Sequence, residues 1–448
     1  MYDLFVIGAG PGGYTAALLA SKKGLRVGIA EGSSLGGTCT NTGCIPTKTY
    51  IESINLYSRI KTASRFGIVA DKPVLTLASL NKRKTRIVSR LVKGIEHLLG
   101  SADVDIFPDT AEFSGQGKVK VGDQFLPSRN IIIASGSRPK IPALFDVPGM
   151  WTSDMLFDIT ELPDSLTIVG GGVIGMEMAH IFSTLGTKVT VVEAMERILP
   201  FEDPDVSDFL KRNSRTIKIY TSSRVTDIQG EGPYRITVES SEGNEALVSE
   251  KILLCIGRAP VIPLGIKSSA VSLNSSGGIQ TDHFMQTSMS CVYAIGDVTG
   301  EYMYAYVASK EAEIAVDHIT GGNRKISYRN IPSIIFTNPE IASVGKSLDE
   351  LDRADIKHGM FPVSALGRAR TMEANDGFAH VVCSALGKIE RVTIVGPHAT
   401  ELISTASLAI ERELTAEDFL RLYHPHPTLS ELLKEAAEDV MGLSVHKP

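Results

Sequence analysis

The sequence is poor in cysteine, tryptophan and long apolar runs. Its 448 residues include five cysteines and a single tryptophan. So few cysteines exclude the disulfide-rich scaffold of a small secreted protein. No apolar stretch reaches the roughly 20 residues that a membrane-spanning helix needs. Because the first expected strand begins at residue 2 or 3, we expect no signal peptide. The few cysteines favour an exchanging pair in a reducing cytosol, so we expect a cytoplasmic location.

A strong excess of charge of one sign is also missing. The formal net charge is −6 and the pI is about 6.0, which argues against a surface for nucleic acids or anionic membranes. Apolar residues interrupt the basic run at residues 82–90 at helical intervals, so we interpret it as a solvated helix face. The composition, 43% hydrophobic and 21% charged, is that of an ordinary globular protein, and the length suggests about three domains.

The N-terminal segment has the pattern of a dinucleotide-binding βαβ unit. An apolar strand is followed by Gly8, Gly10 and Gly13 in a G-x-G-x-x-G turn, and a helix pattern comes next. The glycines let the backbone approach a pyrophosphate at the helix N-terminus. Glu31 ends the second strand, where it can accept hydrogen bonds from a ribose diol. The strand, the helix and the acid make this prediction much stronger than the glycines alone.

The same pattern occurs a second time. Gly170, Gly172, Gly175 and Glu193 each follow their counterpart in the first copy by 162 residues. A shared register over so many landmarks predicts an internal repeat. Two dinucleotide sites in one chain imply two electron carriers.

Cys39 and Cys44 lie between the two copies, in the segment GGTCTNTGCIPTK. On one regular helix their Cα atoms would lie about 7.5 Å apart, whereas a disulfide tolerates at most about 6.8 Å. A disulfide therefore requires that the helix tightens or begins between them, and Asn41 and Gly43 suit an irregular stretch. Two cysteines that merely fill space and a zinc half-site are the alternatives. A second ligand pair for zinc is not evident, so we expect no metal.

Ordered segments along the chain resemble those of a known family. They are GAGPGG at Gly8, GGTCTNTGCIPTK at Gly36, ASGSRP at Ala134, GGGVIGMEM at Gly170, CIGRAP at Cys255, YAIGDV at Tyr293, IPSIIFTNPEIASVGK at Ile331 and HPHPTLSE at His424. In these segments the chain resembles the flavin-dependent (class I) pyridine nucleotide–disulfide oxidoreductases over almost its whole length. Within that family it is most similar to the dihydrolipoamide dehydrogenases, mainly in the last segment.

The resemblance implies an α/β fold with two Rossmann-like dinucleotide-binding domains, one for FAD and one for NAD, and a C-terminal α+β dimerisation domain. Residues 1–142 would form the first part of the FAD domain with the redox disulfide. Residues 143–260 would bind NAD, and residues 261–325 would return to the FAD domain. Residues 326–448 would form the interface of a homodimer.

The resemblance also assigns cofactor contacts. FAD belongs to the first glycine turn and NAD to the second, where the carboxylate of Glu193 repels a 2′-phosphate and so favours NAD over NADP. Asp297 is expected on the ribityl and pyrophosphate region of FAD, although an aspartate after a glycine is also a common turn residue. The other expected contacts are Gly37, Thr38, Lys48, Ser135, Gly136, Gly257 and Gly296.

Catalytic roles follow from the same resemblance. Cys39 is the exchange thiol and Cys44 lies nearer the flavin, while Lys48 lies beside the flavin ring and pairs with Glu177. The alternative for that pair is two exposed side chains worth under about 1 kcal/mol.

His426, from the other subunit, would accept the thiol proton, and Glu431 would orient its ring. Thr428 and Glu431 also have the spacing of a capping box that opens a helix, and the two roles can coexist. His424 is expected to be structural.

The implied activity is the oxidation of dihydrolipoamide to lipoamide with reduction of NAD+. The lipoyl group would be carried by a protein of a 2-oxo acid dehydrogenase or glycine cleavage system. The alternatives are an NAD(P)H-dependent reductase of another disulfide and a docking subunit of a multienzyme complex. Five residues depart from the family pattern and bear on that choice: Thr40, Thr42, Tyr306, Ser343 and Pro425.

Overall fold

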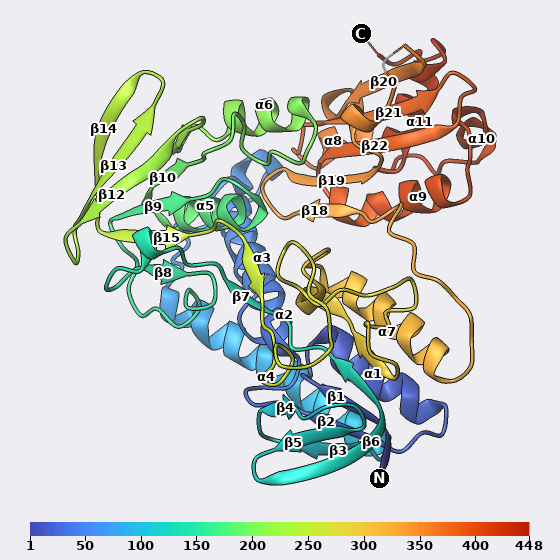
Figure 1. Ribbon diagram of the computed structural model, residues 1–448. Coiled ribbons are helices and arrows are strands. Elements are labelled where there is room, and N and C mark those ends of the chain that lie inside the picture. The colour runs from blue at the N-terminus through green and yellow to red at the C-terminus, as the bar shows by residue number, and fades with distance from the viewer. Residues whose placement is uncertain (353, 448) are drawn as a thin grey trace.

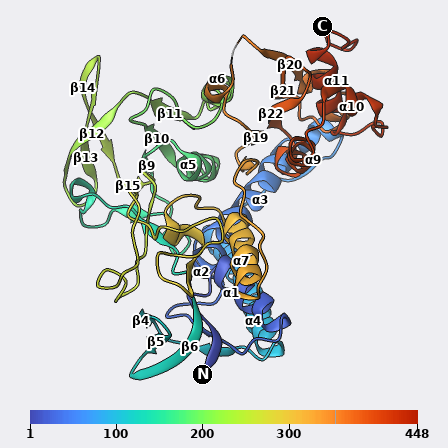
Figure 2. The same ribbon diagram turned by 45° about the vertical axis from the view of Figure 1, so that its right-hand side comes forward.

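The computed structural model describes residues 1–352 and 354–447 of the chain. Three units surround the centre of the molecule, each with its own sheet (Figure 1). The N-terminus lies at the outer end of the first unit, and the C-terminal end lies on the far side of the third. The view turned by 45° shows the same separation of the units (Figure 2).

The first unit is built on a sheet of these strands: β1 (Tyr2–Ile7), β2 (Val27–Ala30), β3 (Asp105–Phe107), β4 (Ala111–Phe113), β5 (Lys118–Val121), β6 (Gln124–Ile133) and β17 (Val292–Ala294). Their order is β3-β2-β1-β6-β5-β4, with β17 also on β6. β1 pairs in parallel with β2 and β6, and β17 pairs in parallel with the end of β6. Strands buried on both faces explain the continuous apolar run of β1, where Leu4, Phe5 and Val6 are fully buried.

Helices cover this sheet and lead away from it. They are α1 (Pro11–Lys22), α2 (Gly37–Asn41), α3 (Cys44–Lys61), α4 (Leu77–Ser101) and α7 (Ala305–Ile319). α1 and α7 pack closely, because the absence of a side chain at Gly12 lets the backbone approach Ala308. A segment nearly 300 residues from the N-terminus thus completes the first unit with β17 and α7.

The second unit contains the strands β7 (Ser137–Pro139), β8 (Trp151–Thr152), β9 (Ser165–Val169), β10 (Lys188–Val192), β11 (Ile217–Tyr220), β12 (Arg224–Gln229), β13 (Tyr234–Ser240), β14 (Gly243–Ser249), β15 (Lys251–Leu254) and β16 (Arg258–Pro260), and the helices α5 (Val173–Leu185) and α6 (Pro204–Asn213). Its parallel sheet has the order β11-β10-β9-β15-β8. β12, β13 and β14 form an antiparallel meander, and β7 pairs with β16 where the chain crosses between the units.

The two parallel sheets share the same turn after their first strand. The N–H of Gly8 donates to Ala30 and that of Gly170 donates to Val192, both at 2.8 Å. A Cβ on Gly175 would lie 2.0 Å from the carbonyl oxygen of Gly170, and the matching position in the first turn is equally tight. The repeat deduced from the 162-residue spacing is therefore present in the backbone, and the predicted two-fold α/β design is confirmed.

The C-terminal unit is an antiparallel sheet with helices packed on it. Its elements are β18 (Ser333–Ile335), β19 (Glu340–Gly345), β20 (Ile356–Pro362), β21 (Phe378–Ser384), β22 (Ile389–Gly396), α8 (Gly367–Thr371), α9 (Ala399–Glu411), α10 (Ala416–Arg421) and α11 (Glu431–Val440). The strand order is β18-β19-β22-β21-β20. Apolar side chains of the sheet, α9 and α11 form one core, in agreement with the predicted α+β character.

Short 3-10 helices complete the fold: η1 (Ala63–Phe66), η2 (Ala143–Phe145), η3 (Gly296–Thr299), η4 (Leu348–Glu350) and η5 (Val363–Ala365). None of the described helices combines the length and the apolar character needed to cross a membrane.

The tight packing of the second glycine turn leads to a first prediction. Gly175→Ala forces a methyl group against the Gly170 carbonyl, so we expect the free energy of unfolding to fall by about 1–3 kcal/mol. Gly94→Ala is the control, because this exposed glycine inside α4 has no described atom within 4 Å of an added Cβ. It should stabilise the protein by about 0.5–1 kcal/mol. Unfolding followed by circular dichroism compares the two, and equal stability of both variants would contradict the packing argument.

Candidate active site

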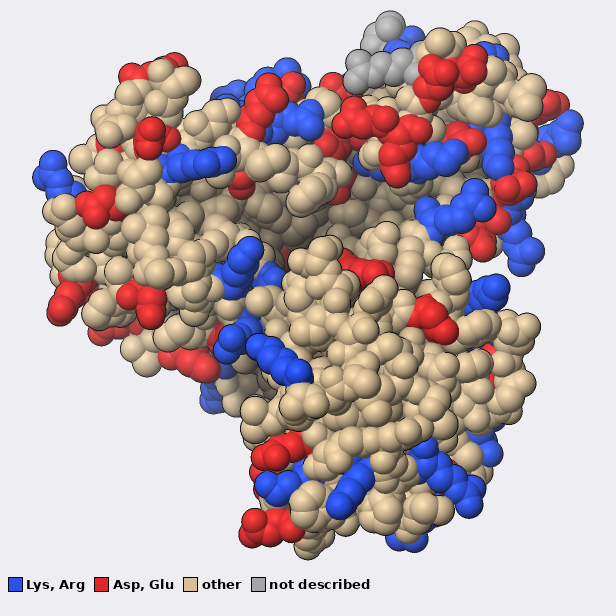
Figure 3. Space-filling model, viewed as in Figure 1, with Lys and Arg blue, Asp and Glu red and all other residues tan. Residues whose placement is uncertain are grey.

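One cavity of about 2050 Å³ reaches from the first glycine turn to the second. The space-filling view shows the surface hollowed where the three units meet (Figure 3). Most of the predicted site residues line this cavity: Gly8, Gly10, Glu31, Gly37, Thr38, Cys39, Cys44, Lys48, Ser135, Gly136, Gly170, Gly172, Glu177, Glu193, Gly257, Gly296 and Asp297. Gly13 and Gly175 lie behind it, where they pack helix against strand.

Both turns have room for a pyrophosphate. Gly10 and Gly172 face the cavity, and no described atom lies within 4 Å of the place where a Cβ would be. Each immediately precedes a helix, α1 or α5, whose first N–H groups and dipole favour a negative charge. The two turns therefore fit two dinucleotides, one on each sheet.

Main-chain N–H groups hold the carboxylates of Glu31 and Glu193, the two candidates for ribose binding. The N–H groups of Ala9 and Ser33 donate to the two carboxylate oxygens of Glu31, both at 2.9 Å. The main chain at the corresponding positions of the second unit donates to Glu193 at 2.6 and 2.7 Å. Each carboxylate is thus in place to accept a ribose hydroxyl, and the negative charge of Glu193 opposes a 2′-phosphate.

The cysteine pair lies where the helix is interrupted. α2 ends at Asn41 and α3 begins at Cys44, so the two cysteines do not share one regular helix. The two thiols interact directly, with Cys39 as the donor and Cys44 as the acceptor. This is the break that the disulfide distance limit required. Cys44 is exposed and lines the cavity.

The environment makes the two thiols unequal. The hydrogen bond from Cys39, helped by the positive charge of Lys48 and opposed by burial, lowers the pKa of Cys44 to about 7. The same hydrogen bond, together with burial, raises the pKa of Cys39. Above pH 7 the reduced pair therefore carries its negative charge on Cys44, while Cys39 keeps its proton.

Lys48 and Glu177 form an ion pair at the junction of the three units. The Lys48 ammonium lies 2.9 Å from both oxygens of Glu177, which is 3% exposed. The N–H of Phe336, after β18, donates to the same carboxylate at 3.0 Å, and the lysine lies over the phenyl ring at 4.7 Å from its centre. The alternative of two exposed side chains is wrong, because Glu177 is buried and the Lys48 side chain, held by contacts to α5 and the C-terminal unit, is only 32% exposed.

Asp297 lies at the start of η3, beside the paired strands β7 and β16. The Ser137 hydroxyl donates to its carboxylate at 2.5 Å, and Arg258 in turn donates to Ser137 at 2.8 Å. Burial raises the pKa of Asp297, against the opposing effects of Ser137 and Arg258. A carboxylate held at a cavity wall by such a relay is suited to accept hydrogen bonds from hydroxyl groups.

His426 lies away from this cavity. Its Nδ1 donates to Glu431 at 2.9 Å, its side chain is 76% exposed, and neither residue is among the described residues that line the cavity. The other oxygen of Glu431 accepts the Thr428 N–H at 2.9 Å, whereas Ser430 is the N-cap of α11. Half of the capping box is therefore formed, and it coexists with the contact to the histidine ring.

His424 has a different environment. Its Nε2 donates to the Phe419 carbonyl at 3.0 Å, and its ring stacks on that phenyl ring. These contacts agree with a structural role.

Three residues near the site were not predicted. Tyr304 and Tyr306 stack on one another and line the cavity. Burial raises the pKa of Tyr306, and the charge of Cys44 acts in the same direction. Glu311 is fully buried and accepts the Gly296 N–H at 2.5 Å, and burial raises its pKa to about 7. Tyr306 was marked only as a departure from the family pattern, and no local signal in the polar segment around Glu311 indicates its burial.

Comparison with family models identifies the chain. The model described as pyridine nucleotide-disulphide oxidoreductase matches residues 2–312, and the model of the dimerisation domain of the same family matches residues 331–437. The chain belongs to the pyridine nucleotide-disulphide oxidoreductase family. Its predicted oxidoreductase class, its FAD and NAD cofactors and its homodimeric assembly are thereby confirmed.

Curated relatives are similar along the whole chain. Dihydrolipoyl dehydrogenase from Chlamydia pneumoniae is 36% identical over 458 residues, covering 100% of this chain and 98% of the relative. The proteins of the same name from Thermus scotoductus and Bacillus subtilis are 36% and 35% identical and cover 99% of this chain. The two alignments cover 98% and 99% of the lengths of these relatives.

Solved structures have the same architecture. LpdA from Mycobacterium tuberculosis matches with a TM-score of 0.89 and 27% identity over 97% of this chain and 98% of its own. The HOCl-induced flavoprotein disulfide reductase RclA from Escherichia coli matches with a TM-score of 0.86 and 28% identity over 98% of this chain and 99% of its own. This agreement confirms the predicted fold class over all three units.

The unequal thiols lead to a second prediction. In the reduced, flavin-free protein, the ultraviolet absorbance of thiolate should rise with a midpoint near pH 7, because the pKa of Cys44 is lowered to that value. Thiolate is then present above pH 7 and is lost below it. Cys44→Ser should remove this transition.

Lys48→Met tests whether the lysine charge helps to lower the pKa of Cys44. Removing the cation should move the midpoint to higher pH by about one unit. A titration unchanged by both substitutions would show that another thiol is responsible.

Proposed function

We propose that the protein oxidises dihydrolipoamide to lipoamide and transfers the two electrons through FAD to NAD+. The observation that carries this proposal is the Cys39–Cys44 thiol pair inside a cavity shared by two dinucleotide-binding turns. Relatives named dihydrolipoyl dehydrogenase along the whole chain support this substrate. The contacts of individual side chains indicate which thiol carries the negative charge, which residue accepts the substrate proton and how the disulfide is exchanged.

His426 acts as the base for the substrate thiol. Because its Nδ1 donates to Glu431, its Nε2 carries the free lone pair that accepts the proton. The carboxylate fixes the ring orientation and stabilises the imidazolium that forms. The ring is exposed and lies outside the cavity of its own chain, which supports a site completed by His426 of one subunit and the cysteine pair of its partner.

Thiol exchange proceeds in two steps from the oxidised pair. The substrate thiolate attacks the sulfur of Cys39, a mixed disulfide forms, and Cys44 leaves as the thiolate that its lowered pKa favours. The second thiol of the substrate then attacks the first substrate sulfur, which is bonded to Cys39 in the mixed disulfide. This attack closes the ring of lipoamide and releases Cys39. The proton on His426 passes to Cys39, whose raised pKa keeps it as a thiol. The freed His426 takes up the proton of the second substrate thiol, and lipoamide leaves.

The residues around the pair are suited to hold the cofactors. Bound FAD supplies the two-electron chemistry that links a dithiol to NAD+. Lys48, fixed by Glu177, would place a positive charge beside the flavin ring, and Asp297 would bind the ribityl region. Gly37, Thr38, Ser135, Gly136, Gly257 and Gly296 would line the nucleotide path. The pairing of β17 with β6 supports the division of the chain into FAD (1–142 and 261–325), NAD (143–260) and interface (326–448) parts.

We further propose that the partner is a protein-bound lipoyl group of a 2-oxo acid dehydrogenase or glycine cleavage system, and that the protein works in the cytoplasm. A long, flexible lipoyl arm suits a thiol pair that lies inside a cavity. A reducing compartment keeps such a pair exchanging.

A reductase of another disulfide is the second candidate. The structural similarity to RclA, named a flavoprotein disulfide reductase, and Tyr306 beside Cys44 favour this possibility. It would use the same cysteines and cofactors in the opposite direction.

A third prediction concerns turnover by purified, FAD-loaded protein. We expect NADH formation from dihydrolipoamide and NAD+, much slower with NADP+. Cys44→Ser should abolish it, because no internal disulfide can form. His426→Ala should slow it by about a hundredfold or more, because the base is lost. FAD-loaded protein without this turnover, but active as an NADH-dependent reductase of another disulfide, would favour the second candidate.

Hybrid dimers test whether the site is shared between subunits. Cys44→Ser and His426→Ala chains, each inactive alone, are mixed in equal amounts, unfolded and refolded together. Half of the dimers should be hybrids with one intact site, so about a quarter of the wild-type activity should return. No recovery from well-folded hybrids would mean that His426 acts on the cysteines of its own chain.

A further inference from the structure

The loop at residues 194–203 connects the second glycine turn to the C-terminal unit. It begins directly after Glu193, and Pro200 and Phe201 in its middle line the cavity. The N–H of Leu199 donates to the carbonyl oxygen of Gly171 at 2.8 Å, so the loop is bonded to the turn itself. Its last residue, Asp203, precedes α6, which adjoins the C-terminal unit in both ribbon views (Figures 1 and 2).

This loop has a strained backbone. Leu199 has φ 47°, in the left-handed region that a leucine rarely adopts, and its side chain is fully buried. Such a conformation persists only where the surroundings determine it. Two contacts do so locally, because the Glu202 N–H donates to the Leu199 carbonyl at 2.9 Å and the Ser207 hydroxyl donates to Ile198 at 2.6 Å.

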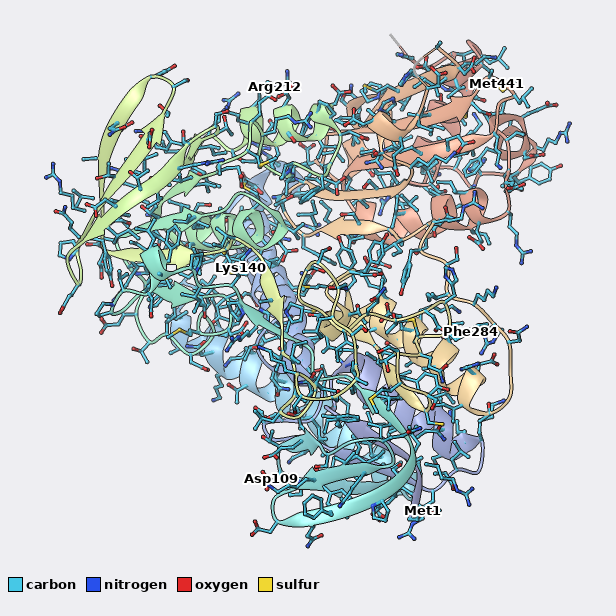
Figure 4. The ribbon with its side chains drawn as sticks, in the orientation of Figure 1. Met1, Asp109, Lys140, Arg212, Phe284 and Met441 are labelled. Atoms are coloured by element: carbon cyan, nitrogen blue, oxygen red, sulfur yellow. The ribbon has the colours of Figure 1, made fainter. Side chains whose placement is uncertain are left out.

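The end of the loop is held by a group of buried polar side chains, which we call the anchoring cluster. Its members are Glu202, Asp203, Ser343, Arg391 and Thr393, all at most 7% exposed. The Arg391 guanidinium and the Thr393 hydroxyl donate to Asp203 at 2.8 and 2.6 Å, and the Ser343 hydroxyl donates to Glu202 at 2.7 Å. The last three come from β19 and β22, so the loop is fixed by the C-terminal unit. Figure 4 shows side chains filling the boundary between α6, which carries Arg212, and this unit.

Burial makes this arrangement specific. Two buried carboxylates need compensation from the arginine and from hydroxyl donors, and they lose it if the loop moves. The strands of the C-terminal unit supply these donors at fixed positions. The loop therefore has one well-defined position relative to the glycine turn.

We propose that the anchoring cluster positions the loop for NAD+ binding, which makes Arg391, Thr393 and Ser343 positioning residues for the second dinucleotide site. The proposal rests on the assignment of NAD to that site. Loss of an anchoring hydrogen bond allows Leu199 to leave its strained conformation. The bond from Leu199 to Gly171 and the cavity wall at Pro200 and Phe201 are then lost for part of the time. Affinity for NAD+ falls, whereas the chemistry at the cysteines is unaffected.

Thr393→Val is the sharpest variant, because it keeps the shape of the side chain and removes only the donor to Asp203. Using the FAD-loaded oxidised protein, calorimetry should show a dissociation constant for NAD+ raised roughly three- to tenfold. The KM for NAD+ should rise in parallel, while kcat at saturating NAD+ and the KM for dihydrolipoamide stay within about twofold of wild type.

Thr393→Ser restores the hydroxyl and should restore NAD+ affinity. Ser343→Ala removes the bond to Glu202 and should weaken NAD+ binding in the same direction. Arg391→Met would leave buried carboxylates without compensation and can prevent folding, whereas Thr393→Ser and Ser343→Ala avoid this problem. Thr400→Val is the matched control, because it removes a comparable bond, to Glu340 at 2.7 Å, in the same unit but away from the loop.

The outcomes separate this proposal from the proposed function. If the wild-type protein binds NAD+ and neither Thr393→Val nor Ser343→Ala changes its affinity, the positioning role is overturned and the function stands. An equal loss in Thr400→Val would attribute the effect to general destabilisation and would also overturn the role. Failure of the wild-type protein to bind NAD+ would instead overturn the cofactor assignment on which both proposals rest.

Discussion

The chemistry of the site depends on the break in the chain between α2 and α3. On one regular helix the two Cα atoms would lie beyond the distance that a disulfide tolerates. With the break, Cys44 becomes the first residue of a new helix. Lys48 follows four residues later, about one helical turn on, so its charge lies on the same side of α3. Glu177 then holds that lysine from α5, and Phe336 holds Glu177 from the C-terminal unit. Side chains from all three units thus meet beside the thiol pair.

The sequence predicted the parts of this structure whose causes are local or repeated. The glycines of both turns are required by close backbone contacts a few residues away, and these contacts recur with the spacing seen in the sequence. The distance limit of a disulfide required a helix break only if the cysteines form one, and Asn41 and Gly43 suited such a break. The partners of Lys48 and His426 came from resemblance to a family. Their side-chain types alone allowed an exposed lysine and a simple helix cap.

Long-range polar contacts could not be predicted in this way. Asp203 and Arg391 are 188 positions apart, and no pattern along the chain connects them. Ser343 was visible only as a departure from a family pattern, and its partner Glu202 became evident from the fold. Glu311 has the sequence context of a solvated helix residue, yet the packing of α1, α7 and the turn at Gly296 buries it completely. In each case the burial of a charge is decided by elements that meet only after folding.

In the proposed mechanism a single folded chain holds only part of the chemistry, because His426 lies outside the cavity of its own chain. There the partner supplies the base, so each cysteine pair works only while two chains remain together. Dimerisation then follows mass action, so dilution should lower the activity per chain even when every chain is folded and loaded with cofactor. The number of working sites would thus be governed by the concentration of the protein itself.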